Sequence, residues 1–110
     1  MILDFDKIEE SIIPNFKGGE KAFLTHMYTD DKNKILLGKL IPGATVGEHV
    51  HEGNSEIIYF LQGKGKVLDD GVCVEVEAGM CHYCPMGHSH SVMNDSDADL
   101  VFFAVVPEHK

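Results

Sequence analysis

The amino-acid sequence predicts an all-β fold, either a sandwich or a barrel. Eight or nine short runs of apolar and β-branched residues follow one another at intervals of roughly 8–12 residues, which is typical of such folds. Turn-forming residues separate the runs, as at Pro42-Gly43 and Asp69-Asp70-Gly71. An Asp-Gly pair suits the positive φ angles of a tight turn, so the second of these turns is expected to join two strands of a hairpin.

The expected strands follow a polar N-terminal segment, in which residues 5–12 form the one stretch expected to be helical. We expect strands at residues 21–28, 34–41, 46–51, 56–62, 67–68, 72–76, 81–84, 90–93 and 100–106. The sequence shows no internal repeat, low-complexity tract or linker. We therefore expect one domain that spans residues 1–110.

The composition indicates a small globular protein with a modest core. The chain has 110 residues, of which 44% are apolar and 25% charged, as in an ordinary folded domain. A chain of this length buries only about two-thirds of its unfolded surface. Pairing with a second copy would add stability, so we expect a homodimer.

The charge distribution argues against several classes of partner. The net charge is −9, whereas nucleic-acid binding depends on clustered Lys and Arg. No stretch approaches the roughly 18 continuous apolar residues of a membrane-spanning helix. The acidic N-terminus, MILDFDKIEE, lacks the basic start and apolar run of a secretory signal. We therefore expect a cytoplasmic protein that binds neither nucleic acid nor a membrane.

The three cysteines do not indicate a disulfide framework. An odd number in a reducing compartment argues against pairing. Cys81 and Cys84 form a C-x-x-C sequence, which could also indicate zinc or redox chemistry. Residues three apart on a strand point to opposite faces, so these two thiols should not converge. We expect both to be small buried or half-buried side chains.

A cluster of histidines suggests a metal site. His49 and His51 are two residues apart on an expected strand, so both imidazoles leave the same face. Glu56 begins the next expected strand after a short loop, and a hairpin there would bring its carboxylate close to them. His90 would have to come from elsewhere in the sheet. Imidazole and carboxylate together suit Fe, Mn, Ni, Co or Zn rather than Ca or Mg.

Residues 43–94 carry two spaced motifs, Gly43-x5-His49-x-His51-x4-Glu56-x6-Gly63 and Gly79-x5-Pro85-x-Gly87-x2-His90-x3-Asn94. With them the chain closely resembles the cupin family, a match that covers about half of the sequence. The resemblance implies a double-stranded β-helix, or jelly-roll barrel, formed by a single cupin domain with motifs at 43–63 and 79–94. It also implies that His49, His51, Glu56 and His90 bind one divalent metal ion inside the barrel.

The resemblance leaves several functions open. Four protein ligands leave one or two positions free on the metal, where a substrate oxygen, water or O₂ could bind. A metal-dependent enzyme acting on a small polar molecule is the leading hypothesis, with oxygenase, isomerase, lyase or decarboxylase chemistry. The alternative is a non-catalytic module that binds or senses a metal or small ligand. A third interpretation is a dimer-forming scaffold paired through residues 1–28.

Other polar residues near the motifs have less specific signals. His88 lies two residues before His90 and is a candidate general acid or base at the mouth of the pocket. His82 is expected to have a packing role, and Glu48 and Glu52 are expected to be surface charges. The four expected ligands could instead be hydrogen-bonded polar residues of a metal-free barrel. Three imidazoles and a carboxylate aimed at one point would be costly without a cation.

The expected strand at residues 56–62 also predicts which side chains enter the barrel. Counting by twos from Glu56, Ile58 and Phe60 should point inward and Tyr59 outward. We interpret these apolar residues as core and interface packing.

Overall fold

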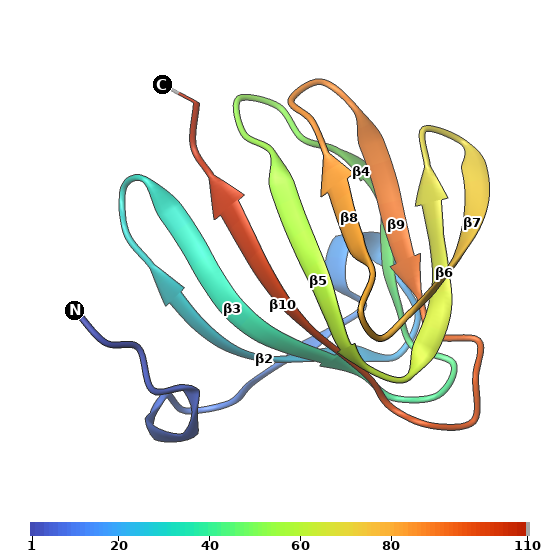
Figure 1. Cartoon of the computed structure of the whole chain (residues 1–110), viewed down its shortest axis with the longest axis horizontal. Helices are drawn as coiled ribbons and strands as arrows, with labels where there is room; N and C mark the ends of the chain where they lie inside the picture. Colours follow the sequence, from blue (N-terminus) through green and yellow to red (C-terminus); the bar gives the residue numbers. More distant parts are fainter. Residues whose placement is uncertain (110) are drawn as a thin grey trace.

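The chain folds into two antiparallel β-sheets that enclose the core, as the computed structural model shows for residues 1–109 (Figure 1). The larger sheet has the strand order β1-β2-β3-β10-β5-β8, and the smaller has the order β4-β9-β6-β7. The strands are β1 (Ser11–Pro14), β2 (Ala22–Thr29), β3 (Asn33–Leu40), β4 (Thr45–Val50), β5 (Glu56–Gln62), β6 (Lys64–Asp69), β7 (Val72–Glu77), β8 (Cys81–Cys84), β9 (Ser89–Met93) and β10 (Leu100–Pro107). The predicted all-β fold is confirmed, and each expected strand largely overlaps an observed one.

The N-terminal segment differs from its prediction. The helix expected at residues 5–12 is only a 3-10 turn, η1 (Phe5–Lys7), and residues 11 and 12 belong to β1. The Ser-Ile-Ile-Pro sequence of β1 explains the difference. β-Branched residues favour strands, and the residue before a proline avoids helical backbone. Since β1 is an edge strand, it can accommodate Pro14.

A second 3-10 turn, η2 (Phe16–Gly18), was not predicted. It lies against β4 and lines one side of the barrel interior. Within residues 1–109, no helix is long and apolar enough to cross a membrane.

Strand β6 begins three residues earlier than the predicted run at residues 67–68. Lys64 lies opposite Glu77 and Lys66 lies opposite Glu75 in the β6–β7 ladder. Opposite charges across a ladder stabilise the pairing, but the polar sequence of these positions concealed the strand. The hairpin predicted at residues 69–71 is confirmed, since β6 and β7 pair up to Asp69 and Val72.

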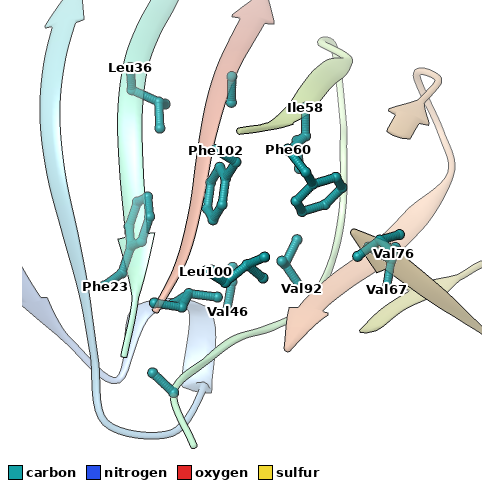
Figure 2. Close-up of a cluster of buried hydrophobic side chains, with 13 residues drawn as sticks. Phe23, Leu36, Val46, Ile58, Phe60, Val67, Val76, Val92, Leu100 and Phe102 are labelled. Atoms are coloured by element: carbon teal, nitrogen blue, oxygen red, sulfur yellow. The ribbon is translucent and has the colours of Figure 1, made fainter. Parts of the chain in front are cut away.

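The core fills the space between the two sheets. Figure 2 shows the side chains of Ile58, Phe60 and Phe102 pointing into the same interior space. Ile58 and Phe60 are 1% and 0% exposed, whereas Tyr59 is 44% exposed, so the predicted alternation along β5 is confirmed. The Phe60 and Phe102 rings meet edge to face with centroids 6.0 Å apart, a favourable aromatic geometry.

Candidate metal centre

Four side chains converge at one end of the barrel. His49 lies on β4, His51 directly follows that strand, Glu56 begins β5, and His90 lies on β9. His90 Nε2 is 3.0 Å from His51 Nε2 and 3.2 Å from His49 Nε2. Glu56 Oε1 lies 3.1 Å from Nε2 of both His51 and His90. The structure thus brings together all four residues that the sequence singled out as metal ligands.

Strand pairing and one tight turn produce this convergence. His49 lies directly opposite His90 in the β4–β9 ladder, and an irregularity between Val46 and His49 shifts the register of that ladder. Such bulges re-aim side chains and are frequent next to functional sites. The chain turns back after His51 through Gly53, whose φ of 74° is one that glycine adopts without strain. That turn returns Glu56 to the histidines.

Each histidine is held by its second ring nitrogen. His49 Nδ1 lies 2.7 Å from the carbonyl oxygen of Gly47, and His51 Nδ1 lies 2.7 Å from Asn54 Oδ1. Because these oxygens can only accept, each Nδ1 must donate its proton to them. The neutral rings then present an Nε2 lone pair to the centre of the cluster. Fixing one nitrogen in this way is how proteins orient metal-binding imidazoles.

His90 is held by a fifth residue, His82 on β8, whose Nε2 lies 3.0 Å from His90 Nδ1. The two side chains are 8% and 1% exposed. Burial, together with the neighbouring His90, lowers the pKa of His82 and keeps its ring neutral. A neutral ring can offer a lone pair to His90, so His82 does more than pack against its neighbours.

The electrostatics of the cluster keep Glu56 ionised. Burial alone would raise the pKa of Glu56, but its contacts with His51 and His90 outweigh burial and lower it to about 2. Burial also lowers the pKa of His49. For His51 burial acts in the same direction, but hydrogen bonds to Glu56 and Asn54 prevail and raise its pKa. An ionised carboxylate therefore lies within hydrogen-bonding distance of the imidazoles of His51 and His90.

The donor set fits a metal ion. Four donor atoms of the kinds that bind transition metals lie within 4.8 Å of one another. Donors at right angles around an ion, each ~2.1 Å from it, would lie ~3.0 Å apart, close to the observed 3.0–3.2 Å. Lone pairs of imidazole and carboxylate repel one another at this spacing unless a cation or a proton lies between them.

Two residues of this arrangement, Asn54 and His82, were not expected to take part in the site. Asn54 lies in the loop between the first-motif histidines and Glu56. A polar residue at that place was the one feature of the sequence that could have indicated a contact with His51. For His82 the packing role predicted from the sequence is incomplete. With Cys84 and His90 it also forms a second group of potential metal-binding atoms, which shares His90 with the first.

His88 lies outside the cluster. Its side chain is 49% exposed, and its Nδ1 contacts Asp70 Oδ2 in the turn between β6 and β7. Among the described residues, His88 is not one of those that line the barrel cavity. The structure therefore gives the predicted general acid or base no contact with the candidate centre.

The two thiols of the C-x-x-C sequence do not converge, as predicted, but Cys81 is exposed and not buried or half-buried as expected. Cys81 is exposed and Cys84 is buried on the same short strand, so their thiols occupy opposite faces. Both are free, as is the exposed Cys73. Burial raises the pKa of Cys84 to about 11, which keeps it a neutral thiol.

A cavity of about 220 Å³ opens beside the four converging side chains. Its walls combine apolar residues from both sheets with side chains of η2 and of the loop after β4. Apart from the four converging residues, the titratable side chains that line it are Lys17, Lys34 and Glu52. Glu52 is exposed, as expected of a surface charge, but it also faces this cavity; Glu48 is exposed and does not line it.

Comparison with known proteins agrees with the fold. Residues 36–106 match the family model described as "Cupin domain". An oxalate-binding protein of Thermotoga maritima is 37% identical over 112 residues, which cover 96% of this chain and 93% of that protein.

Solved structures also resemble the chain. The crystal structure of a T. maritima protein described as a predicted oxalate decarboxylase superposes with a TM-score of 0.92 at 33% identity, over 98% of this chain and 99% of that one. A Cupin 2 conserved barrel domain protein of Salinispora arenicola has a TM-score of 0.74 at 22% identity, over 98% and 88% of the two chains. These matches confirm the predicted jelly-roll architecture.

Proposed function

This chain belongs to the cupin family, and we propose that its barrel holds one divalent transition-metal ion that binds a small carboxylate ligand. His49, His51, Glu56 and His90 would be the protein ligands of the ion. The donor types suit Fe, Mn, Ni, Co or Zn. When bound, the ion would supply a positive charge and an open position for a ligand oxygen.

The observation that carries this proposal is that metal-binding atoms converge although the Nε2 atoms of His49 and His51 carry no proton with which to form hydrogen bonds. The contacts of His49 and His51 with Gly47 and Asn54 occupy the ring protons, so the Nε2 atoms face Glu56 as lone pairs. A cation would satisfy all of these groups together. A protein that used them only as structural polar residues would need protons shared among several close acceptors.

A carboxylate ligand is supported by the relative and by the cavity. The T. maritima relative, 37% identical, is described as binding oxalate, a dianion with four oxygen donors. In this chain the cavity reaches the four donor residues and has lysines on its walls. Although the net charge of the protein is negative, these lysines would attract a carboxylate that approaches the ion through the cavity.

Elemental analysis of the purified protein tests the metal site. We expect close to one transition-metal ion per chain. Replacing His51 with Ala should remove most of the metal, whereas His109→Ala should leave it in place, because His109 contacts Ser55 outside the cluster. Equal metal contents in the two variants would mean that the ligand set is wrong.

Calorimetric titration with oxalate tests the ligand class. Metal-loaded protein should bind oxalate, and protein stripped by a chelator should bind it at least tenfold more weakly, since a lost bond to a charged centre costs about 1.5–3 kcal/mol. Equal affinity of the two forms would contradict binding at the metal.

A metal-dependent lyase, acting as a decarboxylase, is a second candidate function, and the position of Glu52 favours it. Decarboxylation of oxalate breaks the C–C bond, releases CO₂ and adds a proton to carbon to give formate. The described titratable groups that line the cavity are the four converging residues, two lysines and Glu52. Since the four converging residues would bind the metal and the lysines would bind the carboxylate, Glu52 is the candidate general acid that would donate this proton.

Formate production from ¹³C-labelled oxalate, followed by NMR, tests this second function. If the chain is a decarboxylase that uses Glu52, Glu52→Gln should lose at least 100-fold in rate. Glu48→Gln should keep the wild-type rate, because Glu48 does not line the cavity. Metal-loaded protein that binds oxalate without forming formate would make it a binding module.

A further inference from the structure

The cavity beside the candidate metal centre has an apolar wall and a nearby lysine, and oxalate would leave the wall unused. We propose that the cavity selects a carboxylate that carries an apolar substituent, and that Lys17 holds the negative charge of its carboxylate. This inference rests on the proposed function, because the carboxylate is taken to bind at the proposed metal ion.

The apolar wall comes from three strands of the larger sheet. Leu36 on β3, Ile58 on β5, and Phe102 and Val106 on β10 all line the cavity. The first three are at most 4% exposed and point into the barrel interior (Figure 2). Ligand pockets combine such walls with a few polar groups that fix orientation. Oxalate has no apolar group to place against this wall, whereas a longer carboxylate does.

Lys17 is held at the cavity by the packing of η2 on β4. A Cβ atom added at Gly47 would lie 1.9 Å from the carbonyl oxygen of Lys17, so the two backbones are in direct contact. Gly47 is also the residue whose carbonyl oxygen holds His49. The Lys17 ammonium lies 5.6 Å from the centroid of the Phe16 ring, and Phe16 lines the same cavity.

Lys17 lies on the side of the cavity formed by η2, which packs against β4, the strand that carries His49. Lys34 also lines the cavity, but it lies on β3 of the larger sheet, a strand that carries none of the four converging residues. The chain contains no arginine, so lysine is its only permanently cationic side chain.

The backbone of η2 presents Lys17 in a defined conformation. Lys17 has φ 56° and ψ 30°, in the left-handed region that non-glycine residues seldom occupy. Asn15 holds the turn through its side-chain amide, which donates to the Gly19 carbonyl oxygen at 3.0 Å. Unusual backbone geometry that is held in place is frequent at ligand sites. Lys17 combines this backbone geometry with a position on the cavity wall.

A ligand series tests the apolar wall. Oxalate, pyruvate, 2-oxobutanoate, 2-oxopentanoate and 2-oxohexanoate are titrated into metal-loaded protein by calorimetry at low ionic strength. We expect affinity to rise about fourfold with each methylene from pyruvate onward, as burial of a CH₂ group predicts. The longest member should also bind more tightly than oxalate.

Lys17→Met tests the charge, with Lys7→Met as the control. Met is an unbranched side chain of similar length to Lys and has similar backbone preferences. Both variants change the net charge by the same amount. Lys7 is exposed and does not line the cavity. We expect Lys17→Met to weaken binding of 2-oxohexanoate about three- to tenfold, as for a partly exposed ion pair. Lys7→Met should leave the affinity unchanged, and both should keep the wild-type metal content.

The outcomes separate this inference from the proposed function. A rising series together with a loss confined to Lys17→Met supports it. An affinity that stays constant or falls with ligand length overturns the inference, and so do equal effects of the two lysine variants. If the metal content is normal in these experiments, the proposed metal site is not affected. Absence of metal from the wild-type protein would overturn both.

Discussion

Replacing His82 with Phe should weaken metal binding although His82 is not one of the four converging residues. His90 Nδ1 lies 3.0 Å from His82 Nε2 and His90 is 1% exposed, so no water can replace the lost partner readily. Once Nε2 of His90 binds a metal, Nδ1 carries the ring proton and needs an acceptor. In His82→Phe that N–H is buried without one.

The size of the effect follows from the cost of a buried, unpaired donor. That cost is about 1–3 kcal/mol, or roughly 5- to 150-fold in affinity. Residues that hold a ligating imidazole typically contribute about 10- to 100-fold in metal affinity, which lies in the same range. We therefore expect His82→Phe to raise the dissociation constant for Zn²⁺ about 10- to 100-fold.

Competition with a fluorescent chelator measures this affinity, and two variants serve as controls. His82→Gln can place its amide oxygen near the position of the lost Nε2, so its affinity should recover to within about threefold of wild type. Tyr83→Phe changes an exposed neighbour on the same strand and should have no effect. If His82→Phe and His82→Gln bind Zn²⁺ equally well, the hydrogen bond to His90 does not support the metal.

Three further perturbations have expected outcomes. Acidification through about pH 6 should release the metal, because imidazoles must be neutral to bind it, and retention at pH 4, followed by elemental analysis after dialysis, would contradict imidazole ligation. Gly47→Ala should lower the free energy of unfolding by about 1–3 kcal/mol, since the new Cβ would lie 1.9 Å from the Lys17 carbonyl oxygen; a wild-type melting temperature would count against that contact. The Ser89 backbone N–H and then His88 lower the pKa of Asp70, so its stabilising effect should be present above pH 3.8 and be lost as the pH falls below it. Urea unfolding of Asp70→Asn between pH 3 and 6 should therefore show a shallower acid dependence than wild type, and identical curves would refute the role of Asp70.

The fold was predictable where local pattern and burial agree. Alternation along β5 indicated that Ile58 and Phe60 enter the core, and the Asp-Gly pair indicated the β6–β7 hairpin. The prediction was wrong at residues 5–12, where an expected helix is a short turn followed by β1. There the strand preference of the Ser-Ile-Ile-Pro sequence is completed by the pairing of Ile12 with Leu24 on β2, a contact that the expected helix did not take into account.

The four converging residues were also predictable, because their spacing within two motifs resembles that of the cupin family, and the resemblance implied the ligand set. His49 and His51 share a strand face by period alone. Their supporting groups divide into two kinds. Gly47 and Asn54 are neighbours of the histidines along the chain, so local geometry can bring them together. His82 belongs to the larger sheet and His90 to the smaller one, so their contact crosses from one sheet to the other.

The sequence by itself therefore determined the class of fold, the order of the strands along the chain and the donor atoms of the candidate metal centre. Side-chain period and turn chemistry are local properties that a linear pattern records. The tertiary structure alone decided that His82 supports His90, that His88 lies outside the cavity and that Lys17 lies beside it. These positions depend on how the two sheets pack and on which strands become neighbours. The spacing of residues along the sequence does not encode contacts of that kind.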